Sequence, residues 1–335
     1  MLVKSSLRGF SPLSTEALTP DILRGGETSA RRFDPKSAAP FVNKSVSEAT
    51  RRAYGRALRE FFQFTGMKHP SEVVPADVLL WRDKLRSQKK SAATVAFKLS
   101  VIRSFFEYLK AAGAIQLNPA STKLVSPPGL SSEPSGRALL AREVRYLLSG
   151  PDREKPEGAR DYALMLVMLR LSLRVSEVCS LRASSVKWSH GRWTLRCKVK
   201  GGREEVWPLP KEVKEDIDHY LKLDRKRREI AHSDREHAHL FQPHVNYRTL
   251  DFDKALSTRM VQNIVKRWAD YSRIGDLSPH DLRRTAITKA LDSGLTYRQV
   301  QMMSKHKDPK TVMRYDHGRE NMEQNAVNFL AYDEK

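Results

Sequence analysis

Cysteine and long apolar runs are scarce in this chain of 335 residues, and acidic side chains are outnumbered by basic ones. Its two cysteines, Cys179 and Cys197, are too few for a disulfide framework and lack metal-site spacing, so we expect a reducing, cytoplasmic setting. No stretch approaches the ~20 apolar residues that cross a bilayer, which argues against a membrane protein. Residues 1–10 also lack the apolar core of a secretion signal.

The excess of basic over acidic residues gives the chain a large positive charge. Lysine and arginine number 60 against 39 aspartates and glutamates, a formal net charge of +21. Such an excess predicts long-range attraction to a polyanion, with nucleic acid as the first candidate and an anionic membrane surface as the second.

The length suggests about two domains at roughly 150 residues each. Residues 1–44, rich in Ser, Pro, Arg and Gly, are interpreted as a flexible arm, and residues 45–123 as a helical domain. Proline, glycine and serine in 124–137 indicate a linker. A second domain is expected over 138–318, followed by a tail over 319–335.

The first domain is predicted to hold three helices, at 45–66, 73–85 and 91–112. Residues 45–123 contain 14 lysines and arginines against 6 acidic residues, a net charge of +8. A solvated helix face is the ordinary explanation of such charge, but four side chains are candidates for phosphate contacts. These are Lys89, Lys90, Lys98 and Arg103.

The second domain is predicted to be mainly helical, with one β-hairpin. Apolar periodicity indicates helices, and alternation indicates strands. The helices are expected at 141–148, 158–173, 212–230 and 256–271, and the strands at 188–200 and 203–209. Lys200 then lies at the hairpin tip, where a flexible ammonium reaches outward, although lysine is common at such tips.

Arg174 follows the buried helix 158–173 and needs a carboxylate or a phosphate as partner. Glu177, three residues on, can orient it; a simple Arg–Glu ion pair and a phosphate site are equally good explanations of this pair alone.

Two histidines, an arginine and a tyrosine gather in the last helical stretch, 278–315. His280 and Arg283 are three residues apart and share a helix face, and Tyr315 follows His306 by nine residues. Arginine grips phosphate oxygens, histidine transfers protons and tyrosine is an oxygen nucleophile. Each motif alone is common on ordinary helices. The histidines at 232–244 lack completing ligands, so we expect no metal site.

Together these segments closely resemble the tyrosine recombinases, the phage integrase and Xer family, from about residue 45 to the C-terminus. The resemblance implies a mainly α fold with a small antiparallel β-sheet in the C-terminal domain. A SAM-like helical core-binding domain and a mixed α/β catalytic domain would form a two-domain DNA clamp. The matching positions are Arg174 in Leu-Arg-Val-Ser-Glu-Val, Lys200 in Val-Lys-Gly-Gly-Arg-Glu, His280 and Arg283 in Pro-His-Asp-Leu-Arg-Arg, His306 and Tyr315.

The sequence departs from the family pattern twice. Leu171-Ser172 stand where Thr-Gly is common, and Ser304-Lys305 stand where Leu-Gly is usual. Neither change removes a catalytic group. Lys305 is a candidate for contacting phosphate or adjusting the local fold, and Arg284 is a further candidate for DNA contact.

The resemblance implies that Tyr315 attacks the scissile phosphate, giving a 3′-phosphotyrosyl link and a free 5′-hydroxyl. Arg174 and Arg283 would clamp the non-bridging oxygens, with a hydrogen bond from His306. Lys200 would protonate the leaving 5′-oxygen.

His280 would assist Tyr315 as a base, and Glu177 would hold Arg174. The stored bond energy allows strand exchange without ATP, metal or other cofactor. The expected setting is the nucleoid of a prokaryote, phage or mobile element, for integration, excision or resolution.

The expected partners are double-stranded DNA, other protomers in a tetramer on two sites, and an accessory DNA-bending or directionality factor. The tail would dock on a neighbouring protomer through an apolar stripe, although packing within the chain explains it too. The stripe comprises Met322, Ala326, Phe329 and Leu330. A type IB topoisomerase-like enzyme and a non-catalytic DNA-binding protein are the alternatives.

Overall fold

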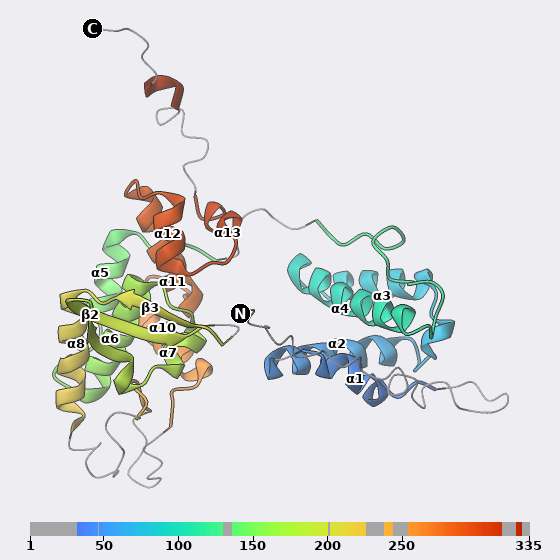
Figure 1. Cartoon of the computed structure of the whole chain (residues 1–335), viewed down its shortest axis with the longest axis horizontal. Helices are drawn as coiled ribbons and strands as arrows, with labels where there is room; N and C mark the ends of the chain where they lie inside the picture. Colours follow the sequence, from blue (N-terminus) through green and yellow to red (C-terminus); the bar gives the residue numbers. More distant parts are fainter. Residues whose placement is uncertain are drawn as a thin grey trace, which may run out of the picture. The chain divides into compact units, whose positions relative to one another are not determined.

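A computed structural model divides the chain into two compact units, Met1–Ser131 and Ser132–Lys335 (Figure 1). No helix among the described residues is both long and apolar enough to cross a membrane. The structure describes residues 32–45, 47–129, 136–199, 202–225, 238–243, 254–316 and 326–329.

The first unit is built on three helices, as predicted: α2 (Glu48–Phe64), α3 (Pro75–Ser87) and α4 (Ala92–Ala111). Their apolar faces meet in a core rich in phenylalanine. A single turn, η3 (Pro70–Glu72), precedes α3, whose first position is the proline expected there.

The helical unit begins before residue 45, so the predicted boundary of the arm is wrong. Residues 35–43 form η2 (Pro35–Ala38) and α1 (Ala39–Asn43). Phe33 and Phe41 are each only 5% exposed and contact the rings of α2 and α4. Two aromatic anchors eight residues apart produce no periodicity, so a search for amphipathic helices misses them. Residues 1–31 lie outside the described part.

Both ends of the predicted linker, 124–137, belong to folded units. Val125 is buried in the first unit, and its carbonyl accepts a hydrogen bond from the Arg103 guanidinium at 3.2 Å. In the second unit, the backbone N–H of Arg137 donates to Asp281 Oδ1 at 3.1 Å. The N–H of Leu139 donates to Thr285 Oγ1 at 2.9 Å.

The second unit surrounds one buried helix, α6 (Pro156–Leu171), which packs between α8 and α11 (Figure 1). Most positions of α6 are buried, as its nearly continuous apolar sequence predicts. The other helical elements are α5 (Ala141–Ser149), α7 (Val175–Ser180), η4 (Ala183–Ser185), α8 (Lys211–Leu223), α10 (Thr258–Tyr271), α11 (Pro279–Asp292), α12 (Tyr297–Ser304), α13 (Pro309–Met313) and η6 (Ala326–Phe329).

The described part of the second unit contains an antiparallel sheet in the order β1 (Val186–Ser189), β2 (Arg192–Lys198), β3 (Glu204–Pro208). The predicted strand 188–200 is in fact two strands. His190 and Gly191 both have positive φ, 53° and 70°, and reverse the chain between them. The β2–β3 hairpin forms as predicted, pairing Leu195 with Trp207.

The fold is therefore mainly α with a small antiparallel sheet in the C-terminal unit, as predicted. Of the apolar stripe predicted in the tail, only the segment η6 is described, while Met322 and Leu330 lie outside the described residues.

Candidate active site

Arg174 lies in a tight connection between the buried helix α6 and α7. Ser172 ends α6 in the left-handed conformation, with φ 52°, and this single residue changes the direction of the chain after the helix. The Glu177 carboxylate accepts hydrogen bonds from the Arg174 backbone N–H at 2.7 Å and from its guanidinium at 2.8 Å. Glu177 is buried while a third of the Arg174 side chain is exposed. The predicted pair exists, and it leaves the outer edge of the guanidinium accessible.

Arg283 lies on α11 and is buried, with 1% of its surface exposed. The cap of α11 fixes its start, because Asp281 accepts hydrogen bonds from the backbone and hydroxyl of Ser278 at 2.8 and 2.6 Å. The Arg283 guanidinium donates to the carbonyls of Ser172 and Ser304, the latter at 2.7 Å. Arg283 thus joins the end of α6 to the end of α12.

His306 completes this junction. Its Nε2 lies 3.0 Å from an amino group of Arg283, and its Nδ1 lies 2.9 Å from Ser304 Oγ. Since arginine only donates, Nε2 accepts here and Nδ1 carries the proton toward Ser304. The preceding residue, Lys305, ends α12 with φ 54°, again left-handed. Both positions where the family pattern has glycine therefore keep the glycine conformation with other residues.

Tyr315 follows α13 and is 4% exposed. Its hydroxyl lies 3.5 Å from His280 Nε2, a long hydrogen bond. Its ring stacks on that of His306, with centroids 6.0 Å apart at 22°. The structure therefore brings His280, Arg283, His306 and Tyr315 together.

Burial and neighbouring positive charge lower the pKa of three groups in this cluster. Burial first, then Arg283 and Arg174, lowers the pKa of His306 to about 3. The pKa of His280 is lowered by burial and then by Arg283 and Arg284. Burial and Arg174 lower the pKa of Arg283 to about 10, so it stays charged at neutral pH. The site thus holds neutral histidines beside buried positive charge, and a bound anion would reduce the repulsion among the arginines.

The remaining predicted site residues lie in varied surroundings. Lys200 is outside the described residues. Lys89 and Lys90 are exposed at the end of α3, where a phosphate contact is sterically open. Arg284 is buried, with its guanidinium 5.4 Å from the centre of the Tyr315 ring, and Lys305 lies 3.3 Å from Glu205. The packing of the Arg284 guanidinium over the Tyr315 ring favours a structural role for this residue.

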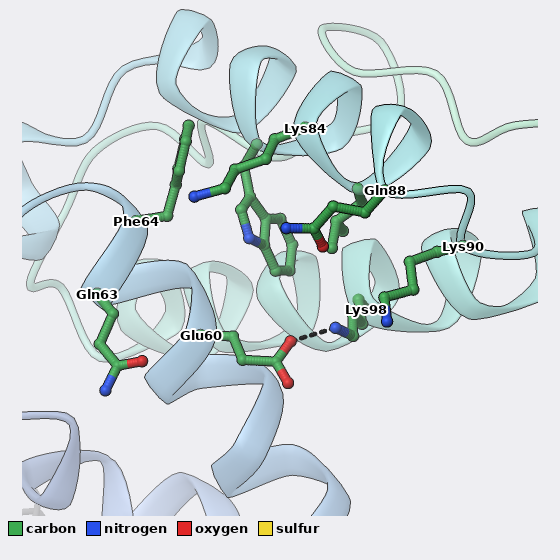
Figure 2. A pocket seen from close by; sticks show the side chains of 9 residues that line it. Glu60, Gln63, Phe64, Lys84, Gln88, Lys90 and Lys98 are labelled. Atoms are coloured by element: carbon green, nitrogen blue, oxygen red, sulfur yellow. Dashed lines mark hydrogen bonds and ion pairs between the residues drawn. The ribbon is translucent and has the colours of Figure 1, made fainter.

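Two other DNA-contact candidates carry internal bonds in the first unit. The Arg103 guanidinium donates to the carbonyls of Ala120 and Val125 at 2.9 and 3.2 Å, which favours a structural role. Lys98 forms an ion pair with Glu60 in a pocket of about 340 Å³ (Figure 2). Lys84 and Lys90 also line this pocket (Figure 2).

Sequence reasoning missed the groups that hold Arg283. The carbonyls of Ser172 and Ser304 leave no pattern in the sequence, because backbone atoms carry no residue identity. The one available signal is position, since each serine lies two residues before a predicted site residue, Arg174 or His306.

Comparison with known families agrees with this geometry. The sequence model of the phage integrase family matches residues 137–322, which is more than half of the chain. The chain belongs to the phage integrase family. It is accordingly a tyrosine-type site-specific recombinase. The model of the SAM-like N-terminal domain of phage integrases matches residues 41–113, which lie in the first unit.

Individual relatives of this phage integrase family member have low sequence identity but align over most of the chain. The tyrosine recombinase XerC of Thermodesulfovibrio yellowstonii is 29% identical over 277 residues, covering 82% of this chain and 88% of that protein. The tyrosine recombinase XerD of Halalkalibacterium halodurans is 27% identical over 281 residues, covering 82% and 89%.

Solved structures share the fold at low sequence identity. The Tn1549 transposon integrase in complex with transposon right end DNA has a TM-score of 0.67 at 16% identity, covering 88% of this chain and 98% of that one. The XerH site-specific recombinase bound to a palindromic substrate has a TM-score of 0.64 at 16% identity, covering 90% of each chain.

Proposed function

We propose that this enzyme cuts and rejoins double-stranded DNA through a 3′-phosphotyrosyl intermediate, with Tyr315 as nucleophile. The observation that carries the proposal is the position of the Tyr315 hydroxyl, 3.5 Å from His280 Nε2. The same cluster contains the buried cation Arg283. A free phenol, with a pKa of about 10, needs such a base to attack at neutral pH.

In the proposed step, the Tyr315 oxygen forms a bond to the scissile phosphorus while the bond from phosphorus to the 5′-oxygen breaks. His280 takes the phenol proton. Its lowered pKa keeps it neutral, and therefore able to accept a proton, at neutral pH. Lys200 gives a proton to the departing 5′-oxygen. Attack by a 5′-hydroxyl of another strand reverses the step and joins the two strands.

Arg174 and Arg283 would bind the non-bridging oxygens and neutralise charge in the transition state. Each is already oriented, Arg174 by Glu177 and Arg283 by two backbone carbonyls. Donors fixed in advance need no reorganisation during the reaction, which is the main source of such electrostatic catalysis.

His306 would donate a further hydrogen bond to the phosphate from Nε2. This requires the tautomer opposite to the one observed, with Nδ1 accepting from Ser304. A hydroxyl both donates and accepts, so Ser304 supports either tautomer by rotating its proton. A phosphate that binds Arg283 can therefore replace the Arg283–His306 hydrogen bond with hydrogen bonds from both side chains to its oxygens.

The wider role follows from the charge and from the relatives. A net charge of +21 supports DNA as partner, and the XerH and Tn1549 structures contain bound DNA. Integration, excision or resolution in the cytoplasm, as a tetramer on two sites, remains our proposal. An accessory bending or directionality factor belongs to the same proposal.

The test uses a library of nicked duplexes with random sequence around the nick, so that cleavage releases a short fragment and traps the enzyme on DNA. Wild-type protein is expected to yield a covalent adduct that survives denaturation, while Tyr315→Phe binds DNA without an adduct. Absence of any wild-type adduct would favour a non-catalytic DNA-binding protein. Two copies of the recovered site should then recombine, whereas relaxation of supercoiled DNA without recombinants indicates a topoisomerase-like enzyme.

A further inference from the structure

Lys305 occupies a backbone position that is unfavourable for lysine. Its φ of 54° and ψ of 33° are left-handed, a conformation that glycine adopts freely and other residues adopt at a cost. Its N–H closes α12 by donating to the carbonyl of Gln301 at 2.8 Å. Glycine would close the helix equally well, so the backbone alone does not explain the lysine.

That side chain joins the end of α12 to strand β3. The Lys305 ammonium lies 3.3 Å from Glu205 Oε2 and 5.2 Å from the centre of the Trp207 ring. Trp207 in turn donates from Nε1 to the carbonyl of Met303 at 2.6 Å. Lys305 and Glu205 are each less than a quarter exposed, so their attraction is less screened than that of a surface pair.

The segment braced in this way carries the groups that hold the catalytic cluster. The Ser304 carbonyl accepts from Arg283, and the Ser304 hydroxyl contacts His306. On the far side, Gln301 Nε2 donates to the carbonyl of His306 at 2.9 Å. A shift of this turn away from β3 would therefore move His306 and one of the two carbonyls that orient Arg283.

We propose that Lys305 is a positioning residue, whose ion pair with Glu205 fixes the turn from Met303 to His306 against the sheet. The turn then presents His306 and Arg283 to the scissile phosphate in reactive geometry. This inference rests on the proposed function, because it assigns a consequence to the rate of strand cleavage. Misplacement of catalytic groups by a fraction of an ångström slows such reactions substantially.

Direct contact between Lys305 and a DNA phosphate is the competing explanation. The substitution Glu205→Gln distinguishes this explanation from the positioning role. If Lys305 positions the turn, Glu205→Gln breaks the brace and slows cleavage as Lys305→Gly does. If Lys305 binds DNA, Glu205→Gln releases the ammonium and leaves DNA affinity unchanged or tighter. Arg203, also near Glu205 at 3.7 Å but over half exposed, supplies the matched control Arg203→Gln.

The experiment measures the single-turnover rate of adduct formation on the recovered nicked duplex at saturating enzyme. Lys305→Gly and Glu205→Gln are each expected to slow cleavage roughly tenfold, a barrier increase of ~1.4 kcal/mol. The double variant should be no slower than either single one, because both remove the same interaction. Lys305→Arg should restore most of the rate, and Arg203→Gln should change it little.

Two further readouts exclude a merely structural effect. The melting temperature of Lys305→Gly should equal or exceed that of wild type, since glycine relieves the left-handed strain. DNA affinity, measured in the Tyr315→Phe background, should stay within about twofold, because binding alone does not need the reactive geometry.

Three results would overturn the inference. Unchanged cleavage rates in both single variants contradict the positioning role of Lys305 and leave the proposed function intact. Weaker DNA binding in Lys305→Gly, with Glu205→Gln unaffected, assigns Lys305 to direct phosphate contact. A wild-type protein that forms no adduct overturns the proposed function first, and this inference with it.

Discussion

The interiors of the two units differ in kind. The first unit packs aromatic rings against one another, for example Phe62 with its centroid 4.2 Å from that of Phe33 and 5.8 Å from that of Phe105. Among its described residues, no lysine, arginine, aspartate or glutamate is buried. The described part of the second unit buries seven such residues: Arg160, Asp161, Glu177, Asp224, Asp281, Arg283 and Arg284.

This contrast separates a scaffold from a site of chemistry. Apolar packing needs no exact partner, so the first unit can carry its positive charge on the surface. Buried charge is costly unless it is paired and hydrogen-bonded, and the second unit supplies these partners. Asp161, for instance, accepts from Arg160, Arg267 and the Trp268 indole. The same arrangement leaves Arg283 fixed and dry beside Tyr315, where an incoming phosphate gains most.

The largest expected effect comes from replacing the fixed guanidinium of Arg283. Arg283→Lys keeps the charge but cannot reach both carbonyls and a phosphate, so cleavage should fall by roughly 10²–10³-fold. Lys98→Gln in the first unit removes a charge that is not part of the catalytic cluster and should leave the cleavage rate at saturating DNA nearly unchanged. Single-turnover adduct formation measures both. Equal losses in the two variants would contradict the division into scaffold and site.

Phe62→Ala tests the apolar interior. Emptying this fully buried position should destabilise the first unit by about 4 kcal/mol. Thermal unfolding followed by tryptophan fluorescence and calorimetry should show the transition of the first unit shifted and that of the second unit kept. A shift of both transitions would mean that the units unfold together.

Asp161→Asn tests the charged interior. It keeps the size of the side chain but leaves Arg160 and Arg267 without their shared carboxylate, a loss of about 3 kcal/mol. Only the transition of the second unit should move, under the same measurement. Asp152→Asn, at an exposed carboxylate of that unit, is the matched control and should have little effect.

Acid should weaken the second unit through its histidines. The pKa of His306 is lowered to about 3 and that of His280 is also lowered, so the folded state binds fewer protons than the unfolded chain. Their contribution to stability is full above the unfolded pKa of about 6.5 and is lost as pH falls toward the folded values.

The pH dependence is measured as the melting temperature of the second unit between pH 7.5 and 5. His306→Asn should reduce its slope. Because neutral His280 is the proposed base, the cleavage rate should also decline as the pH falls over this range. A slope that is the same in wild type and His306→Asn would contradict the assignment.

The smallest effect concerns Ser172, which holds its left-handed conformation at φ 52°. Ser172→Gly should stabilise the second unit by up to ~1 kcal/mol while its carbonyl still accepts from Arg283. Its cleavage rate should match wild type. In Lys305→Gly the same backbone strain is relieved, but the ion pair with Glu205 is lost and the rate falls. Denaturant titration and adduct formation together make this comparison.

The sequence predicted much of this fold because its signals are local. The periodicity of residues 91–112, for example, specifies a helix within a few residues. The helix η2 was missed because the burial of Phe33 depends on its packing against Phe62, which is distant in sequence. The division between β1 and β2 was missed as well. The turn at His190 and Gly191 was missed although glycine is a turn signal, because the alternation of residues 193–200 was extended back across it.

The site shows the same division. Residue type and spacing, read together with the family resemblance, singled out the groups that we propose for the chemistry, because such side chains bind phosphate, move protons or act as nucleophiles. These are Arg174, Lys200, His280, Arg283, His306 and Tyr315. Only the tertiary structure decided how those groups are held. The carbonyls that orient Arg283, the tautomer of His306 and the brace from Lys305 to Glu205 each join segments far apart in the sequence. Such contacts depend on packing in three dimensions, and backbone carbonyls look alike at every residue.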